Sequence, residues 1–365
     1  MRKSYWFTFC LVVVAAAPAT AGNIARTVGT PDIKSAGPLA FGPNGVLFVG
    51  DPLGAAVFAI ETKDTAKKGD AKYSLDGIDK KIADMLGTTA DDILINDLAV
   101  NPASGTVYLS VSRGRGPDAA PVILQVSGDG DIQLVELENV AYAKADLTNA
   151  PENRVTGQGR RRANQRLESI TDVMFEDGRV YVAGLSNEEF ASKLRSIEYP
   201  FQAEIKDTSI EIYHGSHGAY ETRSPVRTFA FYNIDGAPHL LAAYTCTPLV
   251  KIPVEKLQPG EKVMGQTVAE LGNWNRPLDM VVYEKDGQDH LLMANSARGL
   301  MKIPLKEISK TEPITEQIED KAGLEYDTID GMNGVVQLDR LNDGSAVVLV
   351  QTEGGGQNLS TMALP

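Results

Sequence analysis

Short apolar runs recur in pairs along most of the chain, and a turn separates the two runs of each pair. Six pairs are present: residues 38–41 with 46–49, 97–100 with 106–111, 172–175 with 179–183, 228–231 with 239–244, 279–282 with 290–294, and 334–337 with 346–351. Asn-Gly or Asp-Gly joins five of them, and branched and aromatic residues are common in the runs. Each pair therefore predicts two antiparallel strands joined by a tight turn.

Two segments of the chain are nearly identical in sequence, and each contains the second run of one of these pairs. Residues 234–257 and 285–308 are identical at ten of 24 aligned positions and lie 51 residues apart. The first positions of the six pairs are spaced by 51 to 75 residues, which is enough for a four-stranded sheet. We therefore expect an all-β fold, a six-bladed β-propeller. A seventh blade is possible inside the longest interval, residues 97–172.

The two ends of the chain suggest how the ring closes. Only 31 residues follow Gly334, which leaves room for about three strands. Residues 23–28 read as a strand without a partner, so we expect this N-terminal strand to complete the last blade. Residues 78–86 place Ile78, Ile82, Met85 and Leu86 at the spacing of a short amphipathic helix inserted between the first two blades.

The first 21 residues read as a targeting segment. Arg2 and Lys3 precede a mostly apolar run from Tyr5 to Ala17, and Ala19-Thr20-Ala21 suits cleavage before Gly22. We expect a signal peptide over 1–21 and a single propeller domain over 22–365, in an exported protein that is periplasmic or secreted. No later stretch has the roughly 20 apolar residues of a membrane helix, so we expect no membrane insertion.

Charge, cysteine content and missing motifs exclude several kinds of partner, cross-link and cofactor site. The formal net charge is −13, and removal of Arg2 and Lys3 makes it −15, which disfavours nucleic acid as a partner. Cys246 is the only cysteine beyond the predicted signal peptide, so we expect no internal disulfide. The sequence has no C-x-x-C-H haem motif, no P-loop and no G-x-S-x-G turn.

The blade pattern resembles that of exported propellers of the gluconolactonase, NHL-repeat and quinoprotein-like groups. The resemblance implies that the loops leading into the innermost strands lie on one face, together with those between second and third strands. The run Asn96-Asp97-Leu98-Ala99-Val100 is similar to a channel-lining motif of calcium-dependent lactonases. Those enzymes also use a glutamate at the first blade, where this chain has Pro38-Leu39.

Three aspartates occupy equivalent first positions in the blade pattern: Asp97, Asp172 and Asp279. At one level of a ring they could converge on a cation such as Ca²⁺, which takes six to eight oxygen ligands. Alternatively, each could bond backbone N–H groups nearby and cap a turn or strand. The sequence leaves both hypotheses open.

A second candidate metal site combines His214 and His217 with Cys246. Two imidazoles and a thiolate suit zinc or copper, whereas a polar loop beside a small buried cysteine is the structural alternative. His239 and His290 hold equivalent positions in the duplicated segment, which favours a structural role for both.

Polar residues expected on the loop-rich face are candidates for ligand contact: Asn96, Asn187, Asn295, Arg113 and Arg298. Cationic groups there could steer an anionic ligand or an acidic partner. The favoured hypothesis is a binding module for a small-molecule or protein ligand. One alternative is a metal-dependent hydrolase of lactones or phosphate esters that uses the three aspartates. Another is a redox accessory protein with the histidine and cysteine site.

Overall fold

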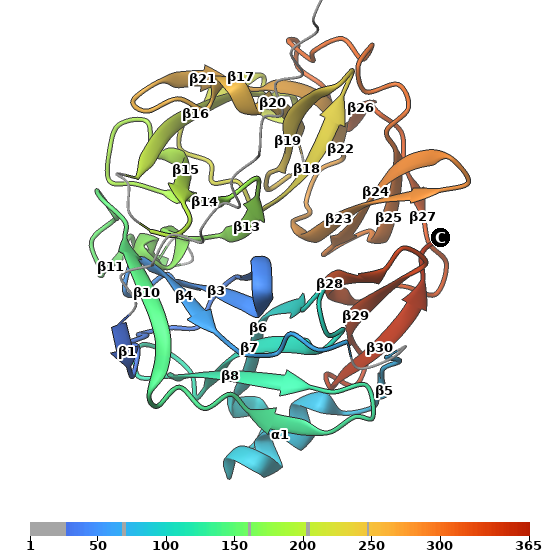
Figure 1. Ribbon diagram of the computed structural model, residues 1–365. Coiled ribbons are helices and arrows are strands. Elements are labelled where there is room, and N and C mark those ends of the chain that lie inside the picture. Colours follow the sequence, from blue (N-terminus) through green and yellow to red (C-terminus); the bar gives the residue numbers. More distant parts are fainter. Residues whose placement is uncertain (1–26, 68–70, 160–161, 202–204, 247) are drawn as a thin grey trace, which may run out of the picture.

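The structure is a computed structural model that describes residues 27–67, 71–159, 162–201, 205–246 and 248–365. It confirms the six-bladed β-propeller, because six sheets stand around a central axis (Figure 1). The predicted signal peptide lies outside the described residues. We number the blades by the order in which their innermost strands occur along the chain.

The first three blades contain strands from residues 27 to 264. Blade 1 consists, from the axis outward, of β2 (Leu39–Phe41), β3 (Val46–Asp51), β4 (Ala56–Glu61), β10 (Val140–Asp146) and β1 (Thr27–Gly29). Blade 2 consists of β6 (Ile93–Val100), β7 (Val107–Arg113), β8 (Ala120–Val126) and β9 (Ile132–Leu134). Blade 3 consists of β13 (Asp172–Glu176), β14 (Arg179–Leu185), β15 (Ser192–Glu198) and β16 (Lys206–His214), with β17 (Ala219–Glu221) and β21 (Lys262–Met264) paired to β16.

The other three blades contain the rest of the chain and one early strand. Blade 4 consists of β18 (Thr228–Ile234), β19 (Ala237–Ala243), β20 (Pro248–Pro253), β22 (Gln266–Leu271) and β26 (Lys321–Gly323). Blade 5 consists of β23 (Pro277–Lys285), β24 (Gln288–Asn295), β25 (Gly299–Pro304) and β27 (Asp327–Thr328). Blade 6 consists of β28 (Val335–Asn342), β29 (Ser345–Gln351), β30 (Gln357–Ala363) and β5 (Ser74–Leu75).

The order of the blades around the ring differs from their order in the chain. The innermost strand of blade 2 contacts those of blades 6 and 1, and blade 1 contacts blade 3 (Figure 1). The spatial order is therefore 1, 3, 4, 5, 6, 2. After β1 and the three inner strands of blade 1, the chain passes the outer edge of blade 6 as β5, builds blade 2, and returns to blade 1 as β10.

The expectation that the N-terminal strand completes the last blade is wrong. Thr27 and Val28 pair with Tyr142 and Ala141 in blade 1, whereas β5 completes blade 6 through the pairing of Leu75 with Leu359. Burial explains why β5 and not β1 completes blade 6: Leu75 is 7% exposed in the core between blades 2 and 6, whereas Val28 is 68% exposed. The expectation also assumed that blades adjacent in sequence are adjacent in space.

Hydrophobic clusters fill the spaces between neighbouring blades, so each sheet packs against both of its neighbours. Separate clusters join blades 1 and 2, blades 1 and 3, blades 3 to 5, blades 5 and 6, and blades 6 and 2. In the duplicated segment His239 pairs with Tyr232 and Pro253, and His290 pairs with Tyr283 and Pro304. The two histidines thus occupy the same cross-strand position in blades 4 and 5.

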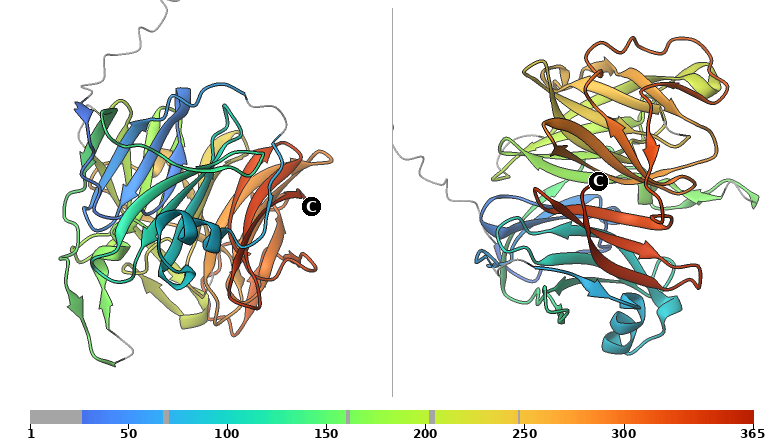
Figure 2. Two further views of the ribbon diagram at one scale, coloured as in Figure 1. Left: turned by 90° about the horizontal axis from the view of Figure 1, so that it is seen from below. Right: turned by 90° about the vertical axis from the view of Figure 1, so that its right-hand side faces the viewer.

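Two insertions complete the fold. The helix α1 (Ile78–Leu86) has the predicted bounds and buries Ile78 and Ile82, but Met85 is largely outside the core. The long interval before blade 3 contains β10 and a hairpin of β11 (Val155–Thr156) and β12 (Ala163–Asn164), which projects from the ring (Figure 2). The described part of this interval holds no seventh blade. None of the described helices is long and apolar enough to span a membrane.

Candidate functional site

A cavity of about 580 Å³ in the central channel is lined, among other residues, by four aspartates of the innermost strands. Three are the predicted Asp97, Asp172 and Asp279, and the fourth is Asp339 on β28. Each accepts a hydrogen bond from a backbone N–H on the innermost strand of a neighbouring blade: Asp97 from Leu39 (2.7 Å), Asp172 from Phe229 (2.8 Å), Asp279 from Leu338 (2.8 Å) and Asp339 from Val100 (2.7 Å). The carboxylates therefore link adjacent blades.

The second oxygen of these carboxylates is also engaged. In Asp172, Asp279 and Asp339 it accepts the N–H of the next residue in the chain, at 2.7 to 2.8 Å. Among the described residues, the aspartates belong to no group of three side chains whose ligand atoms lie within 4.8 Å of one another. This geometry corresponds to the capping alternative, and the calcium site stays a prediction.

Burial has the largest effect on the pKa values of the four channel aspartates. It raises the pKa of Asp172 to about 7 and that of Asp339 to about 6, against the hydrogen bonds from backbone N–H groups, which lower both values. Burial, together with the negative charges of the other channel aspartates, also raises the pKa values of Asp97 and Asp279. At neutral pH the channel therefore holds carboxyl groups that are partly protonated.

Of the five predicted ligand-contacting residues, Asn295 and Arg298 contact each other in blade 5, whereas Asn96 and Arg113 lie in blade 2 and Asn187 follows β14 in blade 3. Asn96 donates to the carbonyl oxygen of Ala36 (2.7 Å), and Asn295 is buried and accepts the N–H groups of Ala297 and Arg298. These two asparagines hold loops in place. Asn187 is exposed and lines a second cavity of about 350 Å³ that also includes Arg154 and Arg223.

The two predicted arginines lie in separate loops. Arg113 ends β7 in blade 2 and is exposed. The Arg298 guanidinium donates to the carbonyl oxygen of Asn273 (3.1 Å), in the loop that joins blade 4 to blade 5. Arg298 therefore supports that loop, which the sequence did not single out.

The loop Gly272–Arg276 presents Trp274 to solvent. This side chain is 91% exposed, and its backbone is left-handed, with φ at +59°. Asn275 fixes the loop, because its side-chain amide donates to the Gly272 carbonyl and its backbone carbonyl accepts the N–H of Cys246 (2.9 Å). A left-handed non-glycine residue is uncommon and persists only where its surroundings impose it.

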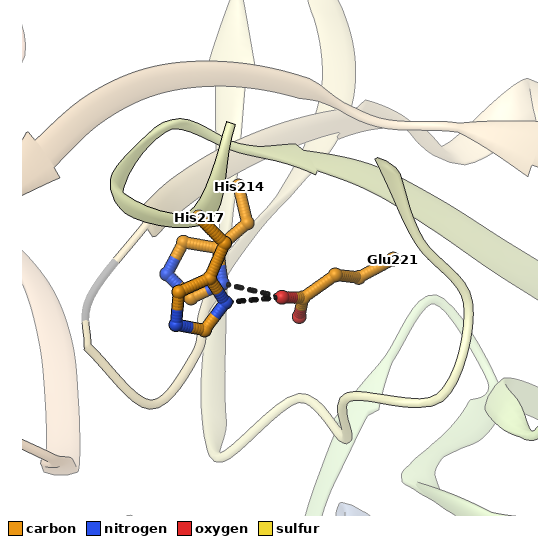
Figure 3. A group of neighbouring side chains, drawn as sticks. All are labelled: His214, His217 and Glu221. Atoms are coloured by element: carbon orange, nitrogen blue, oxygen red, sulfur yellow. Dashed lines mark hydrogen bonds and ion pairs between the residues drawn. The ribbon is translucent and has the colours of Figure 1, made fainter. Parts of the chain in front are cut away.

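His214 and His217 meet at Glu221, where β16 turns into β17 (Figure 3). The Nδ1 atoms of His214 and His217 lie 3.0 Å and 2.6 Å from the same oxygen, Oε1 of Glu221. The imidazole centroids are 4.1 Å apart. These hydrogen bonds and that of Ser224 lower the pKa of Glu221 to about 2, although burial acts in the opposite direction.

This group differs from the predicted one in its third member. Glu221 contacts both histidines, whereas Cys246 lies in the loop after β19 and is not part of the group. The signal that sequence reasoning missed is the spacing His-x-x-His-x-x-x-Glu across the turn. A hairpin brings its last residue back beside its first, which the spacing of the two histidines alone does not reveal.

Comparisons with known proteins bear on the fold. No family model matches the chain, and no curated protein matches it. Solved structures that it resembles include a PQQ-bound aldose sugar dehydrogenase from Streptomyces coelicolor, at 14% identity and TM-score 0.39, covering 93% of this chain and 96% of that one. A putative glucose dehydrogenase from Thermus thermophilus matches at 13% identity and TM-score 0.35, covering 92% and 98%. Drosophila Semaphorin 1b, extracellular domains 1–2, matches at 9% identity and TM-score 0.40, covering 92% and 86%.

These neighbours include quinoprotein-like propellers, one of the groups that the blade pattern resembles. The identities and TM-scores are too low to support any statement about activity. The assignment of the fold therefore rests on the sheet topology itself.

Proposed function

We propose that this protein is an exported binding module that recognises a protein or small-molecule ligand through the face that carries Trp274. The supporting observation is the Trp274 loop itself, in which a nearly fully exposed indole stands on a backbone held by hydrogen bonds. Tryptophan is enriched among the residues that dominate binding energy in interfaces. A fixed loop also loses little conformational freedom when a ligand binds.

Two arginines lie beside this loop and suit a ligand with acidic groups. Arg276 follows Trp274 by two residues, and Arg227 lies close enough that its charge adds to burial in lowering the pKa of Arg276. Arg227 also donates to Glu168 (2.9 Å), which precedes the innermost strand of blade 3. The loops that lead into blades 3, 4 and 5 therefore come close together at Arg276, two residues from Trp274. We propose that Arg276, whose neighbour Arg227 is paired with Glu168, contacts an acidic group of the ligand.

The hydrolase hypothesis has less support. It requires Asp97, Asp172 and Asp279 to offer oxygens to one ion, but each carboxylate already accepts a backbone N–H from a neighbouring blade. We therefore propose a structural role for the channel aspartates and a ligand-binding role for the exposed loop Gly272–Arg276.

Fluorescence offers a direct test, because Trp6 and Trp274 are the only tryptophans of the chain. Protein purified without residues 1–21 then has Trp274 as its single tryptophan. We expect the emission to shift to the blue when fractionated extracts or acidic polysaccharides supply the ligand, and Trp274→Ala to abolish binding of the same fraction. Tyr220→Ala, which removes another exposed aromatic side chain, is the matched control. Equal binding by the Trp274→Ala variant would refute the proposal, and N-terminal sequencing of exported protein checks the cleavage site.

A further inference from the structure

The turn between β16 and β17 gathers three metal-ligating side chains. Glu221 pairs with Ile212 across the hairpin, and His214 is two residues beyond Ile212, so Glu221 and His214 are diagonal neighbours on one face of the strands. His217 lies in the single turn of 3-10 helix between them. One nitrogen from each histidine and one Glu221 oxygen all lie within 4.8 Å of one another.

Several buried polar atoms beside this turn have no hydrogen bond partner in the described part of the chain. They are Nε2 of His214, Oγ of Ser216 and Oε2 of Glu270. Glu270 is next to the turn, because its Oε1 accepts the N–H of Gly215 at 2.6 Å. Buried polar groups are nearly always paired in native proteins, so a concentration of unpaired ones points to a polar ligand.

We propose that His214, His217 and Glu221 bind one divalent transition-metal ion of the zinc class. Imidazole nitrogen and carboxylate oxygen are the ligands that zinc takes from proteins, and three protein ligands leave a fourth position open. His217 is 56% exposed on its side chain, so an ion can enter from solvent. Alkaline-earth ions prefer sets of six or more oxygens and do not suit this pair of imidazoles.

The surroundings of the three side chains match those of a metal site. When Nδ1 of His214 binds the ion, its proton moves to Nε2, and the buried carboxylate of Glu270 offers a charged acceptor in the same neighbourhood. Ser224 donates to Oε2 of Glu221, which orients the other carboxylate oxygen toward the histidines. Glu221 and Glu270 together also place two carboxyl groups beside the proposed ion.

The purified protein can be titrated with Zn²⁺ in a calorimeter after treatment with a chelator. We expect one zinc per chain. His217→Ala should weaken binding by more than the roughly 10–100-fold that loss of an outer-shell partner costs, and this exposed residue can be removed without opening the core. Glu221→Ala should weaken zinc binding similarly. X-ray absorption of the zinc-loaded protein should show nitrogen and oxygen ligands at about 2.0–2.1 Å and no sulfur at about 2.3 Å.

Two matched variants complete the experiment. His239→Ala removes a histidine of blade 4 outside the group, and Cys246→Ser removes the thiol; both should bind zinc as the unmodified protein does. Three results would overturn the proposal: no zinc binding at micromolar concentration, unchanged affinity in His217→Ala, or loss of affinity in Cys246→Ser with a sulfur ligand in the absorption spectrum. None of these results depends on Trp274, so this inference and the proposed function can fail separately.

Discussion

Replacing Asp172 with asparagine should change how stability depends on pH. Burial raises the pKa of Asp172 to about 7, from 3.8 in an unfolded chain. Between these values the folded protein keeps a proton that the unfolded chain releases, so the free energy of unfolding falls as pH rises. The stabilising contribution is complete below pH 3.8 and is lost as pH rises through about 7.

The size of the effect follows from the two pKa values. A difference of about three pH units corresponds to about 4 kcal/mol, at about 1.4 kcal/mol per unit. Solvent in the channel screens part of this energy, so we expect about 2–4 kcal/mol. Asparagine resembles the neutral acid: its oxygen can still accept the N–H of Phe229, although its amide faces the N–H of Val173. The variant should therefore be close to the unmodified protein at pH 4 and more stable at pH 8.

Urea unfolding followed by circular dichroism at pH 4, 6 and 8 measures this difference. Asp177→Asn is the control, because Asp177 lies in an exposed turn where asparagine tolerates the same left-handed backbone. This control should show no comparable gain in stability at pH 8. If Asp172→Asn is instead less stable at pH 8 than the unmodified protein, the ionised carboxylate stabilises the fold, and the reasoning from burial is refuted.

Three further predictions concern packing and the exposed loop. Leu75→Ala should destabilise the protein by about 2–5 kcal/mol, because Leu75 anchors β5 on blade 6. Val28→Ala, at the exposed edge of blade 1, should change stability by less than about 0.5 kcal/mol, and thermal unfolding checks both variants. Ile82→Ala should cost about 2–5 kcal/mol by denaturant unfolding, and Met85→Ala on the outer side of α1 should cost much less. Asn275→Ala should loosen the Trp274 loop, seen as lower tryptophan anisotropy, and should destabilise the protein by about 1–3 kcal/mol because the buried amide of Asn295 loses its acceptor; unchanged anisotropy would contradict the role given to Asn275.

The elements of the fold could be predicted from the sequence because their signals are local. Alternating apolar runs and Asp-Gly turns mark the first two strands of each blade, and the spacing of Ile78 and Ile82 marks α1. The spatial order of the blades has no local signal. It depends on which distant edge receives β5 and β10, and strands of two to seven residues contain little pairing information.

The candidate sites could be predicted only in part, because the sequence shows local patterns but not which distant residues meet. The equivalent positions of Asp97, Asp172 and Asp279 indicated a common level around the ring, but not that each side chain bonds the next blade. Trp274 had no periodic pattern to mark it. Cys246 was grouped with the histidines because both lie near blade 4 in the sequence, whereas Glu221 reaches them through a hairpin.

The exchanged positions of the first two blades have a consequence for how the chain can assemble. Blade 1 lacks its fourth strand until residues 140–146 are available, and β5 has no partner until residues 357–363 arrive at the far end. An N-terminal fragment therefore leaves two unsatisfied strand edges, and no early half of the molecule is a finished unit. Closing the torus links Leu75 to Leu359, so acquisition of the native state should be slow and should depend on residues 357–363.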